Sequence, residues 1–334
     1  MTRIKNKLAL IIVLLCGIFL IISFNQSKGI YKDEQMIYGI VAGDIKDVNQ
    51  KCSFGLIDTK TGDITEKIFD FGSDGSYPDA TLSPTGQYVA FNKWIEKTDR
   101  ELFIYDLKNK TSKQLTSNSN GEINRISWLD DSTIIGVFCS HEKGKDGWHL
   151  FSFDIKTNEM KFLTNANSQN GEYVYFNGVK ALTGQNKILF ARGNESEYLT
   201  SWNDKKYKNA LYICDSQGLN IEKLLTFDDR TIGGISVSHD NENVLIEAFK
   251  YPENNNELEC SDLYLYNLKT GETKLLEDGT KNAQIEHWNL NWLDNNSVVY
   301  RNQSEWKSID INTMKTSSLF ENNKNLVAVI PKVK

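Results

Sequence analysis

Short runs of alternating apolar and polar residues fill the chain after residue 35, which is the pattern of half-buried β-strands. One sequence pattern recurs. It consists of an aromatic-rich run that ends in Asp or Asn, a polar turn and a second run. Its copies are FGLIDTKTGDITEKIF from 54, LFIYDLKNKTSKQLT from 102, LFSFDIKTNEMKFLT from 150, LYICDSQGLNIEKLLT from 211, LYLYNLKTGETKLLE from 263 and WKSIDINTMKTSSLF from 306. The first runs end at Asp58, Asp106, Asp154, Asp215, Asn267 and Asp310. Because Asp, Asn and Gly favour tight turns, each copy is a predicted hairpin.

A shorter pair of strands precedes most of these hairpins. These pairs are ATLSPTGQYVAF from 80, RISWLDDSTIIGVF from 125, VKALTGQNKILFARG from 179, GISVSHDNENVLIEAF from 234 and NLNWLDNNSVVYRN from 289. Four strands per unit, repeated at roughly 40 to 50 residues, are the signature of a β-propeller blade. The sequence therefore predicts an all-β, six-bladed β-propeller of four-stranded antiparallel blades. The alternative, an open sandwich of hairpins, leaves the period unexplained.

The two ends of the repeat region complement each other. The first unit has only three runs, MIYGIVA from 36, SFGLID from 53 and ITEKIF from 64, and it lacks an innermost strand. A spare run, LVAVIP, begins at residue 326. We expect the strand at 326–330 to enter the first blade and close a propeller that spans residues 36–334, because ring closure leaves no open sheet edge.

An unbroken apolar run at residues 8–24, LALIIVLLCGIFLIISF, follows the basic residues Arg3, Lys5 and Lys7. Its length is at the lower limit for a membrane-spanning helix. We expect an uncleaved transmembrane signal anchor at 8–24, a cytoplasmic tail at 1–7 and a linker at 25–35, with the body outside the cell membrane by the positive-inside rule. A cleaved signal peptide is one alternative. A lipid-modified Cys16 is a weaker one, because Leu15 replaces the usual small residue.

Charge and cysteine content narrow the function classes. The net charge is −6 although residues 1–24 carry only basic charges, so the body is acidic and we expect no nucleic-acid partner. The cysteines of the body form no C-x-x-C motif, which argues against a zinc knuckle, and we expect them to be buried. The sequence leaves a Cys139–Cys214 disulfide open.

Catalytic and metal-binding motifs are absent from the sequence. There is no G-x-S-x-G elbow, no histidine pair at metal-ligand spacing and no phosphate-binding glycine loop, so we predict no metal and no cofactor. In a propeller, the long connections between second and third strands gather on one face, where recognition is common. The predicted binding residues of this long-loop face are Trp94, His141, Trp148, Tyr198, Trp202, Tyr207 and Tyr251. About half of them are expected to be structural, and so are Trp128, Trp288 and Trp292, which we place between blades.

The stretch LSPTGQYVAF at 82–91 resembles the strand-turn-strand motif of the TolB-like family of propeller repeats. Ser83, Pro84 and Gly86 match the family pattern, and Thr85 stands where Asp is usual. The resemblance covers residues 36–330 and implies a β-propeller. It implies no single function, because such repeats occur in envelope scaffolds, in binding proteins and in the propellers of peptidases. We expect neither TolB's extra N-terminal domain nor a peptidase domain in this chain.

These patterns favour a membrane-anchored, extracytoplasmic, non-catalytic binding or protein-interaction module. We expect an envelope protein or a carbohydrate as ligand, bound on the long-loop face or at the mouth of the central channel. The alternative is a polysaccharide-acting hydrolase or lyase with its site in that channel, which carboxylates or histidines converging from different blades would favour. A sensor that signals through the anchor is a third interpretation, which the short tail at 1–7 weakens. The sequence does not indicate an oligomeric state.

Overall fold

The computed structural model describes most of the chain after residue 35. The described residues are 36–42, 51–73, 78–95, 99–117, 119–141, 147–164, 174–194, 209–250, 260–279, 285–302, 305–320 and 325–330. The predicted anchor, residues 8–24, lies outside this set. Within the set, no helix is both long enough and apolar enough to cross a membrane.

The described chain is all-β, and its strands form antiparallel sheets in sequence order. Four sheets have four strands each and one has eight. The first sheet contains β24 (Leu326–Ile330), β1 (Met36–Ala42), β2 (Lys51–Asp58) and β3 (Ile64–Ser73). The eight-stranded sheet contains β4 (Ala80–Leu82), β5 (Tyr88–Ile95), β6 (Asp99–Asp106), β7 (Thr111–Gln114), β8 (Gly121–Trp128), β9 (Thr133–Ser140), β10 (Gly147–Asp154) and β11 (Glu159–Phe162).

The remaining three sheets each follow the simple order of an up-and-down meander. They are β12 (Val174–Leu182), β13 (Lys187–Asn194), β14 (Asn209–Asp215) and β15 (Glu222–Thr226); β16 (Thr231–Val237), β17 (Asn243–Lys250), β18 (Cys260–Asn267) and β19 (Thr273–Glu277); and β20 (Ile285–Trp292), β21 (Ser297–Asn302), β22 (Glu305–Asp310) and β23 (Lys315–Leu319).

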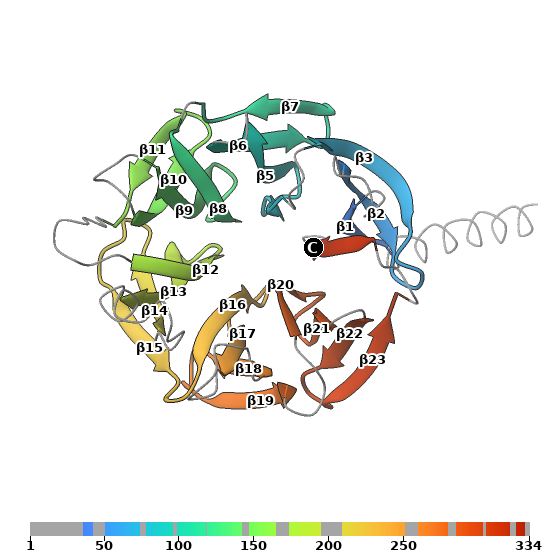
Figure 1. Ribbon diagram of the computed structural model, residues 1–334, viewed down its shortest axis with the longest axis vertical. Coiled ribbons are helices and arrows are strands. Elements are labelled where there is room, and N and C mark those ends of the chain that lie inside the picture. Colours follow the sequence, from blue (N-terminus) through green and yellow to red (C-terminus); the bar gives the residue numbers. More distant parts are fainter. Residues whose placement is uncertain are drawn as a thin grey trace, which may run out of the picture.

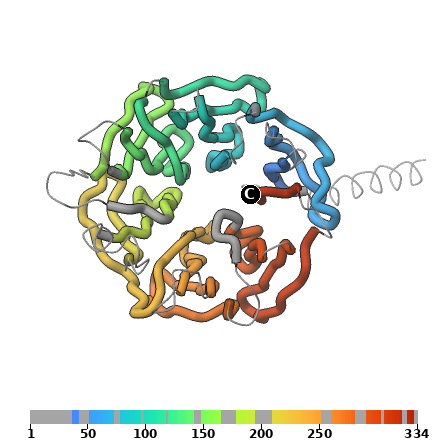
Figure 2. Tube along the Cα trace, in the orientation of Figure 1, coloured from blue at the N-terminus to red at the C-terminus, as the bar shows by residue number. Residues whose placement is uncertain are grey.

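The sheets are arranged in a ring, with one edge strand of each toward the centre and the other on the outside (Figure 1). A cavity lies at this centre, which we call the central channel. The eight-stranded sheet divides into two runs of four strands, because a single parallel bridge between Arg100 and Glu122 joins β6 to β8. The C-terminal strand β24 pairs antiparallel with β1 and takes the channel-facing edge of the first sheet. The backbone trace in Figure 2 therefore runs once around the ring and returns to its start.

Apolar side chains fill the spaces between neighbouring sheets. Trp128 and Trp292 are 3% and 1% exposed. Each donates its indole N–H to a carbonyl of the preceding run of four strands, that of Thr81 or Ser236, at 3.1 Å. Tryptophan suits this position because its large apolar ring fills the gap while its one donor finds a partner. The predicted inter-blade role is confirmed for both. The side chain of Trp288 lies outside the described residues.

The six residues that end the first runs of the sequence repeat all hold hairpin turns. In each turn one side-chain oxygen of the anchor accepts backbone N–H groups two to four residues further along. The anchors are Asp58, Asp106, Asp154, Asp215, Asn267 and Asp310. In five turns the residue four positions after the anchor has a positive φ, for example Gly62 at 73° and Asn158 at 58°. These contacts satisfy turn donors that a short loop would otherwise leave to water.

Turns between first and second strands contact the corresponding turns of neighbouring runs of four strands. The N–H and hydroxyl of Thr85 donate to Asp131 at 2.9 and 2.7 Å. The Asn241 amide donates to the carbonyl of Thr183 at 2.8 Å, and the N–H of Asp240 donates to Asn295 at 3.1 Å. These contacts tie neighbouring turns to one another on this face and help to hold the channel-facing strands in position.

Candidate functional site

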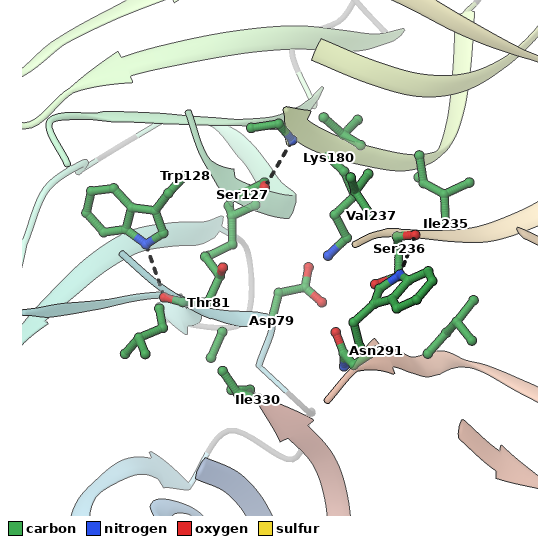
Figure 3. Close-up of a pocket in the computed structure, with 18 of the residues that line it drawn as sticks. Asp79, Thr81, Ser127, Trp128, Lys180, Ile235, Ser236, Val237, Asn291 and Ile330 are labelled. Atoms are coloured by element: carbon green, nitrogen blue, oxygen red, sulfur yellow. Dashed lines mark hydrogen bonds between the residues drawn. The ribbon is translucent and has the colours of Figure 1, made fainter. Parts of the chain in front are cut away.

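A cavity of about 510 Å³ lies in the central channel. Its lining residues come from the channel-facing strands β4, β8, β12, β16, β20 and β24 or from residues next to them (Figure 3). This volume is within the range of small-molecule binding sites. Because six chain segments far apart in sequence build the cavity, its shape depends on the closed ring.

Four charged residues line the cavity, and three of them, from separate parts of the chain, act on one another. Asp79 precedes β4, Arg125 lies in β8 and Lys180 lies in β12. In Figure 3 the ammonium end of Lys180 and the carboxylate of Asp79 point toward one another. We call these three residues the channel cluster.

Asp79 is fixed by several hydrogen bonds. Its carboxylate Oδ2 accepts the backbone N–H of Arg125 at 2.7 Å and the side-chain amide of Asn92 at 3.3 Å. Its own N–H donates to Asn92 Oδ1 at 2.7 Å. Asn92 is fully buried and also donates to the carbonyl of Ile123 at 2.8 Å. The negative charge of the cluster therefore has a defined position in the channel wall.

Lys180 is half-buried and forms no ion pair or hydrogen bond through its side chain within the described part of the chain. Removal of its ammonium group from water lowers the pKa of Lys180 below the usual value. Attraction to Asp79 opposes this shift, and repulsion from Arg125 adds to it. Desolvation is the largest of the three effects, so the neighbouring carboxylate does not fully compensate the buried charge.

Arg125 has an unusual backbone conformation for a strand residue. Its φ is 54°, and it lies where the pairing of β8 with β9 shifts between Asn124 and Ser127. Other residues with positive φ, such as Asn158 and Asn241, belong to turns. A left-handed conformation is costly for a residue with a Cβ, and the hydrogen bond to Asp79 helps to hold it. The bulge places Arg125 among the residues that line the cavity.

Uncharged polar groups of the lining bond mainly within the channel wall. Asn291 donates its amide to the carbonyl of Val329 at 2.7 Å, and the Ser127 hydroxyl accepts the N–H of Ala181 at 3.2 Å. Figure 3 shows Asn291 and Ser127 around the same space as Asp79 and Lys180. The walls are therefore preorganised, and the site can orient a polar ligand without refolding.

The structure places three of the seven residues predicted for the long-loop face. Trp94, at the end of β5, has the Arg100 guanidinium 5.6 Å from its ring centroid. His141, just after β9, lies 3.1 Å from the Glu122 carboxylate through Nε2. Trp148 packs against the apolar cluster between strands β8–β11 and strands β12–β15. Tyr198, Trp202, Tyr207 and Tyr251 lie outside the described residues. The long-loop binding surface therefore stays a prediction.

Sequence reasoning named the channel mouth but none of the residues of the channel cluster. One signal was available, because Arg125 and Lys180 are the cationic residues in channel-facing runs where the other copies carry small, apolar or amide side chains. That signal gives no pairing, since Asp79 and Lys180 meet only through ring closure.

The cysteines and candidate metal ligands add no second site. The Cys139–Cys214 disulfide that the sequence left open is not formed. Burial raises the pKa of the Cys214 thiol to about 12, which leaves it unreactive. No group of three or more His, Cys, Asp or Glu side chains that could hold a metal occurs in the described ranges.

No protein-family model and no curated protein matches this chain. Several solved structures are similar to it. TolB from Acinetobacter baumannii is 13% identical with a TM-score of 0.62, over 89% of this chain and 67% of that one. A chain of a nidogen/laminin complex is 8% identical with a TM-score of 0.59, over 88% and 97%. An oligogalacturonate lyase in complex with manganese is 11% identical with a TM-score of 0.55, over 85% and 73%. At these identities the likeness shows the β-propeller fold alone.

Proposed function

We propose that this TolB-like β-propeller is an extracytoplasmic binding module, anchored in the cell membrane by residues 8–24, whose ligand enters the central channel. The observation that carries the proposal is the channel cavity of about 510 Å³, where charged side chains from three elements converge between hydrogen-bonded walls. A rigid, preformed cavity of this kind suits recognition, since little ordering is needed when a ligand binds.

We count six blades in this propeller and treat the eight-stranded sheet as two. A single parallel bridge is a weak link compared with the continuous ladders on either side of it. Pairing of β24 with β1 supports a closed ring, and closure supports a rigid scaffold because it joins the last strand of the chain to the first sheet. The anchor and the extracytoplasmic position rest on the apolar run at 8–24 and the basic residues before it.

A protein partner or a carbohydrate is the proposed ligand class. The similar chain from the nidogen/laminin complex supports the first, as a propeller solved together with another protein. An enzyme that acts on a polysaccharide is the second candidate function. It is favoured by Asp79 and His239, which line one cavity from different sheets, and by the likeness to an oligogalacturonate lyase. Incubation of the purified full-length protein with oligogalacturonate, followed by product sizing, tests this candidate directly.

Site-specific photo-crosslinking in intact cells tests the binding proposal. A photoreactive residue replaces Thr183, which is exposed at the channel rim, or, as a control, Thr111 on the outer strand β7. We expect a discrete adduct from position 183 that position 111 does not give, and we expect Val237→Trp, which narrows the channel, to remove it. Equal adducts from both positions, or an adduct that survives the narrowing, would contradict a channel ligand.

Orientation is tested separately with protease added to intact cells. We expect the propeller to be digested while a cytoplasmic marker stays intact. Protection of both proteins would contradict the extracytoplasmic position but not the fold.

A further inference from the structure

We propose that the channel cluster recognises a singly charged carboxylate of a small ligand or ligand end group, with Lys180 and Arg125 as its ion-pair partners. This inference rests on the proposed binding function and adds the chemical class of the ligand. It follows from the charge balance, the hydrogen bonds and the size of the cavity.

The charge balance of the channel cluster is positive. Lys180 and Arg125 are cations, and Asp79 is the one carboxylate that acts on Lys180. Asp294 also lines the cavity, but its carboxylate accepts the N–H groups of Asn296 and Ser297 in its own turn, both at 2.7 Å. His239 is the remaining titratable group of the lining. Within the channel cluster itself, two cations therefore face one carboxylate.

Both cations have unused donors. The guanidinium of Arg125 forms no hydrogen bond or ion pair with the described residues, and its backbone N–H is the group that binds Asp79. Lys180 faces Asp79 without forming an ion pair with it. A partly desolvated cation without a close partner is unfavourable, because burial removes hydration that nothing replaces. An anion between Lys180 and Arg125 would replace that hydration in both side chains.

A carboxylate fits this arrangement better than a phosphate. A planar carboxylate accepts two parallel N–H groups from a guanidinium, and a point charge such as the Lys180 ammonium completes the contact. Inorganic or esterified phosphate carries roughly −1.5 to −2 charges near neutral pH. The fixed charge of Asp79 would repel the second negative charge, whereas a monoanion matches the difference of one positive charge within the channel cluster. A cavity of about 510 Å³ also accommodates a small acid or an end group rather than a folded domain.

Matched acids and neutral analogues test the proposal on the purified full-length protein in detergent. The probes are galacturonate against galactose, N-acetylalanine against its amide, and inorganic phosphate, followed by calorimetric titration and thermal shift. We expect at least one acid to bind at millimolar concentration and raise the melting temperature, with no effect of its neutral analogue and weaker binding of phosphate. Loss of the ion pair in Lys180→Met should weaken binding roughly tenfold or more, since each 1.4 kcal/mol is tenfold.

Two control variants separate charge recognition from damage to the fold. Lys187→Met removes an exposed lysine at the start of β13 and should leave acid binding unchanged. Lys180→Arg keeps the charge and should retain binding that Lys180→Met loses, while all three variants keep the thermal transition. Binding of the neutral analogues as well as the acids, preference for phosphate, or no binding of any acid would overturn the inference. A Thr183 adduct that persists with no acid binding would overturn the carboxylate alone and leave the channel function standing.

Discussion

Two clusters of arginine and aspartate side chains show how similar residues serve different purposes in this propeller. One is the channel cluster of Asp79, Arg125 and Lys180. The other, which we call the rim cluster, contains Arg230, Asp229, Asp262 and Tyr264 beside β16 and β18. The channel cluster has two cations for one carboxylate, and the rim cluster has two carboxylates for one cation.

Each charged group of the rim cluster is paired by hydrogen bonds. Arg230 Nε and Nη2 donate to Asp262 Oδ2 at 2.8 and 2.6 Å, and Nη1 donates to Asp229 at 2.6 Å. The second oxygen of Asp262 accepts the N–H of Gly279 at 2.8 Å. Hydrogen bonds to the two carboxylates raise the pKa of Arg230 despite its burial, whereas desolvation lowers the pKa of Lys180. The comparison teaches that satisfied charges stabilise the fold and unsatisfied ones remain available to a ligand.

The largest expected effect comes from opening the rim cluster with Asp262→Ala. The side chain of Arg230 is only 16% exposed, so the variant leaves a buried charge without its main partner. We expect a loss of about 3 to 5 kcal/mol in the free energy of unfolding, measured by denaturant titration. Asp229→Ala is the control, because Asp229 is 59% exposed and should cost less than about 1 kcal/mol. Equal losses would show that the buried pair has no special role.

Asp79→Ala should have the next largest effect, because the Arg125 N–H and the Asn92 amide both lose an acceptor. We expect a loss of about 1 to 3 kcal/mol in unfolding free energy. Asp79→Asn keeps an oxygen acceptor and should lose less, which separates the hydrogen bonds from the charge. If the asparagine variant lost as much as the alanine variant, the charge itself would be the stabilising feature.

Lys180→Met should leave stability within about 1 kcal/mol of the wild type, in contrast to Asp262→Ala. The variant removes a desolvated cation that has no ion pair and keeps most of the apolar stem. Denaturant titration of both variants side by side measures the difference. A loss as large as that of Asp262→Ala would mean that Lys180 is a structural residue and not an open site.

The smallest expected effect is on pH dependence. Lys180 has a lowered pKa in the folded protein, so above that pKa the unfolded chain binds more protons than the folded chain and stability rises with pH up to the usual lysine value. As the pH rises toward the usual lysine pKa of about 10.4, the wild type should therefore gain stability relative to Lys180→Met. The pKa of Arg230 is raised and the pKa of Asp229 is lowered, so neither group contributes to this pH dependence. If the difference in unfolding free energy between the wild type and Lys180→Met fell with rising pH, the lowered pKa of Lys180 would be contradicted.

Most of the fold was predictable because the signals for it are local. Alternating side chains specify strands, and an Asp or Asn at the end of a strand specifies its turn through bonds within four residues, as Asp106 and Asn267 show. The all-β class and the TolB-like resemblance are confirmed for this reason. The inter-blade positions of Trp128 and Trp292 were predictable too, since large aromatic residues in strands are usually buried.

The sequence by itself determined the repeating hairpins, the turns and the residues that fill the gaps between sheets, because each depends on neighbours within one unit. Only the tertiary structure decided that Asp79, Arg125 and Lys180 share one cavity while the rim cluster is closed. The physical reason is that charge compensation depends on distance in space. Three units far apart in sequence meet at the channel only when the strands are arranged as a ring, and nothing local in the sequence encodes that meeting.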